Sequence, residues 1–199
     1  TMFGALMLKA GDVDGYVSGA CHSTANTLRP GLQVVKTAPG IKTVSSCFIM
    51  IAPDGGNKYN PDGVAVFADC AINIEPDAQQ LADIAVSSTK TAKAIAGIEP
   101  RVAMLSFSTK GSGNDDKFFK SVPKMQEATA LAKEMAPDLA LDGEFQFDAA
   151  VAPEVGELKA PGSKVAGHAN VFIFPNINAG NIGYKIAQRF GGYMAIGPV

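Results

Sequence analysis

The chain has 199 residues, of which 47% are hydrophobic and 18% are charged, and its net charge is −2. This balance is typical of a protein with a buried core, and it argues against a broad positive surface for nucleic acid or anionic membranes. The longest apolar run, 47–52, is too short to span a bilayer, and no secretory signal pattern opens the chain. A cytoplasmic protein without membrane or nucleic-acid partners is therefore expected.

Strand-like and helix-like segments alternate along the chain, which indicates an α/β fold of three α/β/α layers. Apolar runs predict strands that helices cover on both faces, at 44–52, 63–67, 101–106, 139–141 and 171–174, with a further short strand at 15–17. Periodic apolar residues predict helices over 76–95 and 122–136. The faces expected to be buried carry Leu81, Ile84, Ala85, Ala92 and Ile95, and Met125, Ala128, Leu131, Ala132 and Met135. Polar, glycine-rich composition predicts a mobile surface loop at 108–121 and a second loop region at 154–170.

The three cysteines are odd in number and widely spaced. They fit neither a disulfide framework nor a zinc site, and Cys47 and Cys70 are expected to be small buried hydrophobic residues. His22 and His168 have no carboxylate or cysteine neighbours at the spacing of metal ligands. Neither a metal nor another cofactor is expected.

The segment 174–189, FPNINAGNIGYKIAQR, leads from an apolar strand into a helix. Helix N-termini at the carboxyl ends of strands offer free N–H groups to anions. Gly180 and Gly183 are expected to let a ligand approach the backbone, and Lys185 is placed in the first turn or two, with Arg189 one turn further. The pattern indicates a phosphate or carboxylate site. The alternative is a polar loop whose two cations merely reach into solvent.

A second candidate anion site lies in residues 14–30, DGYVSGACHSTANTLRP. Ser18 precedes a glycine, Ser23 or Thr24 is placed at the N-cap of a helix, and Arg29 has the fork of donors that clamps an anion. The alternative interpretation makes the hydroxyl groups simple caps and the arginine a surface charge.

Three carboxylates, Asp142, Glu144 and Asp148, lie in residues 139–153. Paired carboxylates can act as general acid and base. Glu144, Gln146 and Asp148 also alternate with two phenylalanines, as one polar face of a strand would. A structural role or a place on the rim of a substrate site is favoured.

The order of five segments resembles phosphate acetyltransferase (phosphotransacetylase), of the phosphate acetyl/butyryltransferase family, over essentially the whole chain. These segments are GYVSGACHSTANTLRPGLQ, RVAMLSFSTKGS, LALDGEFQFDAAVAP, KAPGSKVAGHANVFIFPNINAGNIGYKIAQR and AIGP. The resemblance implies two α/β domains of the isocitrate dehydrogenase-like fold around a cleft, usually in a homodimer, present here only in part. Residues 1–40 and 191–199 would belong to the larger domain and 41–190 to the smaller one.

The activity that the resemblance implies is reversible transfer of an acetyl group between CoA and inorganic phosphate, without a metal or a covalent acyl-enzyme. Arg29 matches an arginine that binds the CoA phosphate. The residues that would line the acetyl phosphate side of the cleft are Ser18, Ser23, Thr24, Asn178, Asn181 and Lys185. CoA, acetyl phosphate and phosphate are thus the expected partners.

Two departures from the family pattern qualify this expectation. Asp54, Gly55 and Gly56 stand where some members carry a cysteine near the active site. The family's catalytic serine, arginine and aspartate follow the AIGP motif, so no catalytic residue is expected within this chain, which is interpreted as an inactive fragment. The alternatives are phosphate butyryl transfer and a non-catalytic, acetyl-CoA-sensing domain similar to the terminal domain of some malic enzymes.

Overall fold

The computed structural model describes residues 1–37, 41–114 and 120–199, and the chain divides into two units. In the described part of unit 1, Thr1–Lys42, the regular elements are all helices. These are α1 Met2–Ala10, α2 Thr24–Pro30 and the π-helix η1 Gly31–Val35. The short strand predicted at 15–17 is wrong, because these residues lie outside any regular element and Val17 is almost fully exposed.

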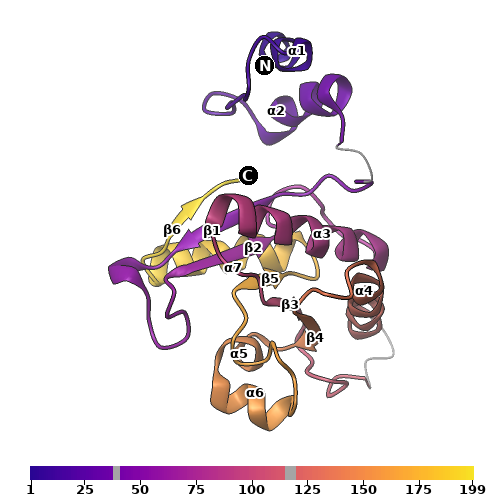
Figure 1. Cartoon of the computed structure of the whole chain (residues 1–199), viewed down its shortest axis with the longest axis vertical. Coiled ribbons are helices and arrows are strands. Elements are labelled where there is room, and N and C mark those ends of the chain that lie inside the picture. The colour runs from indigo at the N-terminus through magenta and orange to yellow at the C-terminus, as the bar shows by residue number, and fades with distance from the viewer. Residues whose placement is uncertain (38–40, 115–119) are drawn as a thin grey trace. The chain divides into compact units, whose positions relative to one another are not determined.

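Unit 2, Thr43–Val199, holds a six-stranded mixed sheet in the order β4-β3-β5-β2-β1-β6 (Figure 1). The strands β2, β5, β3 and β4 run parallel to one another, whereas β1 is antiparallel to both β2 and β6. The strands are β1 Cys47–Ile51, β2 Val64–Ala68, β3 Val102–Leu105, β4 Leu141–Phe145, β5 Val171–Ile173 and β6 Met194–Ile196. The other elements are η2 Pro53–Gly55, α3 Ala78–Thr91, η3 Ala92–Ala96, α4 Ser121–Met135, α5 Phe147–Val151, α6 Pro153–Lys159 and α7 Ile177–Phe190.

Helices cover both faces of the sheet, which confirms the predicted α/β/α layers. Alternate residues of one strand enter different cores: Val66 and Ala68 pack on the side of α3 and α4, and Ala65 and Phe67 on the side of α7. Because both faces are buried, the strands read as continuous apolar runs. None of the helices in the described part of the chain is long and apolar enough to cross a bilayer.

The two long predicted helices are present, but each exposes one residue that was expected in the core. Helix α3 begins after Asp77, whose side chain accepts from the backbone N–H of Gln80 (2.8 Å) in a capping box, and it passes into the π-helix η3. Ile95 lies in η3 and is exposed, because the wider π turn shifts the apolar period. Met135, the last residue of α4, is also exposed.

The segment 154–170 is not simply a loop, because α6 spans Pro153–Lys159 and Val165 and Ala166 are buried in the core. Within the predicted loop 108–121, Ser108 and Thr109 are buried, while residues 115–119 lie outside the described residues. The predicted burial of Cys47 and Cys70 is confirmed, and Cys21 is exposed. Burial raises the pKa of the Cys47 thiol to about 11, with a smaller contribution from the charge of Asp69.

The division near residue 42 lies close to the predicted domain boundary at 40. The assignment of 1–40 and 191–199 to a larger domain stays a prediction. In unit 2, β6 pairs with β1, matching Ile49 to Ile196.

Candidate functional site

Helix α7 begins at the carboxyl end of β5, at the predicted strand–helix junction. Asn176 caps it, since its side-chain oxygen accepts from the backbone N–H of Ala179 at 3.1 Å. Gly180 lies against the sheet: a Cβ there would come within 2.4 Å of the carbonyl oxygen of Asp69. Its expected role in ligand approach is therefore wrong. The missing side chain lets α7 approach the end of β2.

Lys185 is held in place by a chain of two hydrogen bonds. Its Nζ donates to Oδ1 of Asn181 at 2.6 Å, and Nδ2 of Asn181 donates to the carbonyl oxygen of Cys70 at 3.0 Å. Lys185 lies in the third turn of α7 rather than in the first two, where it was predicted. At that distance the helix N-terminus repels its ammonium little, so this repulsion gives no reason to expect a neutralising anion. Arg189 lies in the last turn, where the helix dipole favours a cation.

Asn178, Asn181 and Lys185 form one stripe of α7, with spacings of three and four residues. Asn178 and Lys185 are exposed and Asn181 is half-buried. The structure thus brings these three residues to the same side of one helix. The Lys185 ammonium also lies over the ring of Tyr184, 5.2 Å from its centroid, and it is exposed where an anion could reach it.

The other predicted residues, Ser18, Ser23, Thr24 and Arg29, lie in unit 1. Ser23 is the N-cap of α2, and its Oγ accepts from the backbone N–H of Asn26 at 3.3 Å, as expected for one of the two candidates. Thr24 is the first residue of that helix. Ser18 lies before it in an irregular segment, and Arg29 lies in its last turn with an exposed side chain.

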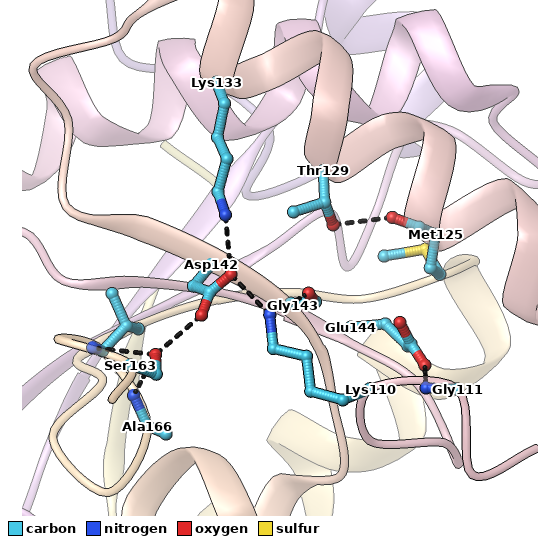
Figure 2. Close-up of polar contacts among 11 residues, drawn as sticks. Lys110, Gly111, Met125, Thr129, Lys133, Asp142, Gly143, Glu144, Ser163 and Ala166 are labelled. Atoms are coloured by element: carbon cyan, nitrogen blue, oxygen red, sulfur yellow. Dashed lines mark hydrogen bonds and ion pairs between the residues drawn. The ribbon is translucent and has the colours of Figure 1, made fainter. Parts of the chain in front are cut away.

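The carboxylate of Asp142 is surrounded by three donors at the edge of the sheet (Figure 2). Lys110 Nζ and Lys133 Nζ each donate to Oδ1 at 2.7 Å, and Ser163 Oγ donates to Oδ2 at 2.7 Å. Burial acts to raise the pKa of Asp142, but hydrogen bonds from the lysines and the serine outweigh it and lower the pKa to about 2. A carboxyl group whose pKa lies so far below neutral pH stays charged there and is a poor proton donor.

Glu144 is buried and holds the segment that follows β3 (Figure 2). Its Oε1 accepts from Ser108 Oγ at 2.8 Å and from the backbone N–H of Gly111 at 2.7 Å. Glu144 has no partner in the ladder between β3 and β4, because the register shifts there from a pair with Gly143 to a pair with Phe145. This bulge ends the simple alternation of strand faces.

Asp148 lies in the first turn of α5, where it accepts from Lys159 Nζ at 2.9 Å. The predicted polar strand face over Glu144, Gln146 and Asp148 is therefore wrong. The hydrogen bonds of Asp142 and Glu144 support the structural role, and the alternative place on the rim of a substrate site stays a prediction. Among the described residues, no group of three His, Cys, Asp or Glu side chains is arranged to hold a metal ion.

A cavity of about 940 Å³ beside α7 was missed by the sequence analysis. Phe67, Leu105, Phe107, Phe147, Phe174, Ile186 and Phe190 line it, with Glu75, Lys120 and Lys124 among its polar residues. Its lining, taken over the described residues, includes Gly183 but not Asn178, Asn181 or Lys185. The polar stripe and the cavity thus lie on different sides of α7. The sequence signal for the apolar side of α7 was the spacing by four residues of Ile182, Ile186 and Phe190, of which the last two line the cavity.

The whole chain matches a family model described as "Phosphate acetyl/butaryl transferase", over residues 1–199. It is 57% identical over 197 residues to a phosphate acetyltransferase of Thermoanaerobacterium thermosaccharolyticum, covering 99% of this chain and 58% of the relative. It is 56% identical to a phosphate acetyltransferase of Bacillus subtilis, covering 99% of this chain and 57% of the relative. The chain therefore spans less than three fifths of the length of these relatives.

Solved structures agree with this likeness. The crystal structure of a phosphotransacetylase from Streptococcus pyogenes superposes with a TM-score of 0.90 and 55% identity, covering all of this chain and 57% of that one. The EutD phosphotransacetylase from Staphylococcus aureus gives 0.87 and 53%, with the same coverage. The match over every residue of the chain, at this level of identity and with the same fold, shows that the chain belongs to the phosphate acetyl/butaryl transferase family.

Proposed function

We propose that this chain is part of a phosphate acetyltransferase, which reversibly transfers an acetyl group between CoA and inorganic phosphate. The observation that carries the proposal is the unbroken match to the family over residues 1–199, with 57% identity to a relative that bears this name. The partners are CoA, acetyl phosphate and phosphate, and the assembly is a homodimer. Residues 1–40 and 191–199 belong to a larger domain, and 41–190 to a smaller one.

Seven residues are proposed to bind these anionic substrates. Arg29 binds a phosphate of CoA, for which an exposed guanidinium with paired donors is suited. Lys185, oriented by Asn181, meets the phosphoryl group of acetyl phosphate. The remaining residues on the acetyl phosphate side are Ser18, Ser23, Thr24 and Asn178.

In the direction that forms acetyl-CoA, the CoA sulfur forms a bond to the acetyl carbon of acetyl phosphate. The bond from that carbon to the phosphate oxygen breaks, and inorganic phosphate leaves with the electron pair. A cation at the leaving phosphate stabilises the charge that gathers there, and this is the role proposed for Lys185. The resemblance assigns thiol deprotonation and stabilisation of the tetrahedral oxyanion to an aspartate and a serine after the AIGP motif. Residues 1–199 would then supply binding and positioning.

The test is steady-state kinetics of the whole gene product that contains this chain. Replacing Arg29→Ala should raise the KM for CoA at least tenfold, which corresponds to about 1.4 kcal/mol, with a smaller effect on acetyl phosphate. Lys185→Ala should lower kcat/KM for acetyl phosphate at least tenfold. Lys93→Ala is the matched control, because Lys93 is exposed on η3 and pairs with Glu99. Unchanged constants in both site variants would overturn the assignment.

The same assay separates acetyl from butyryl transfer. A series of acyl phosphates of increasing chain length should give the highest kcat/KM with acetyl phosphate. A maximum at butyryl phosphate would assign the chain to the other activity in the family's description.

A further inference from the structure

The first residue after β2 carries a buried carboxylate to which the proposed reaction gives no role. Asp69 is 2% exposed, and its carboxylate accepts hydrogen bonds from uncharged donors. The donors to Oδ1 are Ser46 Oγ at 2.8 Å and the backbone N–H groups of Ala71 at 2.9 Å and Ile72 at 3.1 Å. The donors to Oδ2 are the backbone N–H of Asn73 at 2.9 Å and its Nδ2 at 2.6 Å. One side chain therefore holds three consecutive N–H groups of the segment 69–74, which we call the β2 loop.

The first half of α7 lies against the β2 loop. In the first turn, the backbone N–H of Ile177 donates to the carbonyl oxygen of Ile74 at 3.1 Å. Gly180 contacts the start of the loop closely, because it has no side chain. One residue further along the helix, Nδ2 of Asn181 donates to the carbonyl oxygen of Cys70 at 3.0 Å. The helix that carries the polar stripe therefore depends for its place on backbone atoms of the β2 loop.

A single peptide unit connects the carboxylate of Asp69 to the helix. The carbonyl oxygen of Cys70 and the N–H of Ala71 belong to the same planar group, in which they point in opposite directions. Asp69 Oδ1 holds this N–H, so it also fixes the direction of the carbonyl oxygen that accepts from Asn181. Asn181 Oδ1 in turn accepts from Lys185 Nζ at 2.6 Å. A chain of hydrogen bonds thus leads through one rigid peptide from a buried carboxylate to an exposed ammonium.

We propose that Asp69 is a positioning residue, which holds Lys185 at the place where the phosphoryl group of acetyl phosphate binds. The inference rests on the proposed function, because it takes the anion-binding role of Lys185 from there. A lysine side chain is flexible, and an ammonium that is already held in place loses less conformational entropy when the anion binds. Asp69 itself touches no substrate. Its effect is therefore expected on the affinity for the anion, and only through Lys185.

Position 69 requires two accepting oxygens, which explains why a carboxylate stands there. Asp69→Asn keeps the size of the side chain but replaces one accepting oxygen by an NH₂ group, which donates. That group would face either the N–H groups of Ala71 and Ile72 or the N–H of Asn73, and two donors cannot bond to each other. The β2 loop would lose part of its support, and the Cys70 carbonyl oxygen would be held less firmly toward α7.

The experiment is titration calorimetry of the whole gene product with inorganic phosphate, together with steady-state kinetics for acetyl phosphate. Asp69→Asn should weaken phosphate binding at least about fivefold and raise the KM for acetyl phosphate by a similar factor, with a smaller change in kcat. Asn73→Ala should act in the same direction and serves if the first variant does not fold. It removes the Nδ2 that donates to Asp69 at 2.6 Å and to the carbonyl oxygen of Val44 at 3.0 Å.

Asp83→Asn is the matched control. Asp83 Oδ2 also accepts from a residue before β1, Thr43 Oγ1 at 2.7 Å, but within the described chain it has no hydrogen bond to the β2 loop. The control should lower the urea midpoint and leave phosphate affinity within about twofold of the unaltered protein.

A double-mutant cycle separates positioning from a general loss of stability. If Asp69 acts through Lys185, Asp69→Asn should change phosphate affinity by less than about twofold once Lys185→Ala is already present. A purely structural role would give the same loss in both backgrounds. Urea unfolding of each variant shows that the protein is folded under the conditions of the titration.

The possible failures are distinguishable. If Lys185→Ala weakens phosphate binding but Asp69→Asn and Asn73→Ala do not, the positioning role is wrong and the proposed function stands. Equal losses for Asp69→Asn with and without Lys185, or a comparable loss for Asp83→Asn, would also overturn the positioning role. Unchanged phosphate affinity in Lys185→Ala would overturn the anion site of the proposed function, and the role of Asp69 with it.

Discussion

Replacing Asp142 by asparagine should lower the free energy of unfolding in a way that depends on pH. The folded pKa of Asp142 is about 2 against 3.8 for an unperturbed side chain, and one unit corresponds to about 1.4 kcal/mol. The charged carboxylate therefore contributes about 2 kcal/mol to stability at pH 7 and at low ionic strength. The side chain of Asp142 is only 14% exposed, so solvent screening reduces this stabilisation of the carboxylate little.

The direction of the pH dependence follows from the lowered pKa of Asp142. The contribution is complete above about pH 5 and is lost as the pH falls from 3.8 toward 2, so about 1 kcal/mol should remain at pH 3. The variant Asp142→Asn keeps the size of the side chain and one accepting oxygen. The side chains of Lys110 and Lys133 are already 38% and 50% exposed in the unaltered protein, so in the variant both ammonium groups can return to water. The loss therefore reports the charge of Asp142 itself.

The assay is urea unfolding followed by circular dichroism, which suits a chain without tryptophan, at pH 7, 5 and 3. Asp148→Asn is the matched control: Asp148 pairs with Lys159 but is 54% exposed, and such pairs contribute about 1 kcal/mol or less. The expected result is a difference between the two variants at pH 7 and 5 that shrinks at pH 3. A loss for Asp142→Asn that is the same at all three pH values would refute the reasoning.

Two further predictions concern the packing of α7 and the activity of the chain. Gly180→Ala should destabilise the protein by about 2 kcal/mol, because the new Cβ would lie 2.4 Å from the carbonyl oxygen of Asp69. Gly15→Ala is the control, since a Cβ at Gly15 would meet open space and should change stability by less than about 0.5 kcal/mol. Equal urea midpoints for the two variants would contradict this prediction. Residues 1–199 alone should form acetyl-CoA at least a hundredfold more slowly than the whole gene product, since CoA without a base is only a few per cent thiolate at neutral pH. Comparable rates would place the catalytic residues within this chain.

Four of the six strands, β1, β2, β3 and β5, could be predicted from the sequence because each carries its own signal. The strand predicted at 139–141 lies at 141–145, and β6 was not predicted. Val64–Ala68 is apolar at every position, and the structure sends its alternate side chains into two cores. A strand of this kind needs no knowledge of its neighbours to be recognised. The same is true of the long helix after Asp77, whose cap and apolar period are both local.

The features that were missed depend on contacts between distant segments. Helix α6 is short and polar, and it is held where Gly156 meets Gly167: a Cβ at Gly156 would lie 2.6 Å from the backbone nitrogen of Gly167. Glu144 is buried because Ser108 and the backbone of Gly111, more than thirty residues earlier, supply its donors. Neither contact leaves a periodic pattern in the sequence.

Helix α7 shows the same limit within the candidate site. Its residues form three stripes at helical spacing: a polar one with Asn181 and Lys185, an apolar one with Ile186 and Phe190, and one of small and aromatic residues. Spacing alone does not tell which stripe meets the sheet. In the structure the third stripe meets the sheet through Gly180, and the polar and apolar stripes lie on other sides of the helix.

Two stripes of α7 therefore have effects that should separate in the whole gene product. Lys185→Ala removes an exposed cation from the polar stripe and should lower kcat/KM for acetyl phosphate without changing the urea midpoint. Gly180→Ala alters the stripe that meets the sheet and should lower that midpoint, because the new Cβ would lie 2.4 Å from the carbonyl oxygen of Asp69. If Lys185→Ala lowered the urea midpoint as much as Gly180→Ala does, its loss of activity would follow from loss of stability. The binding role proposed for Lys185 would then be wrong.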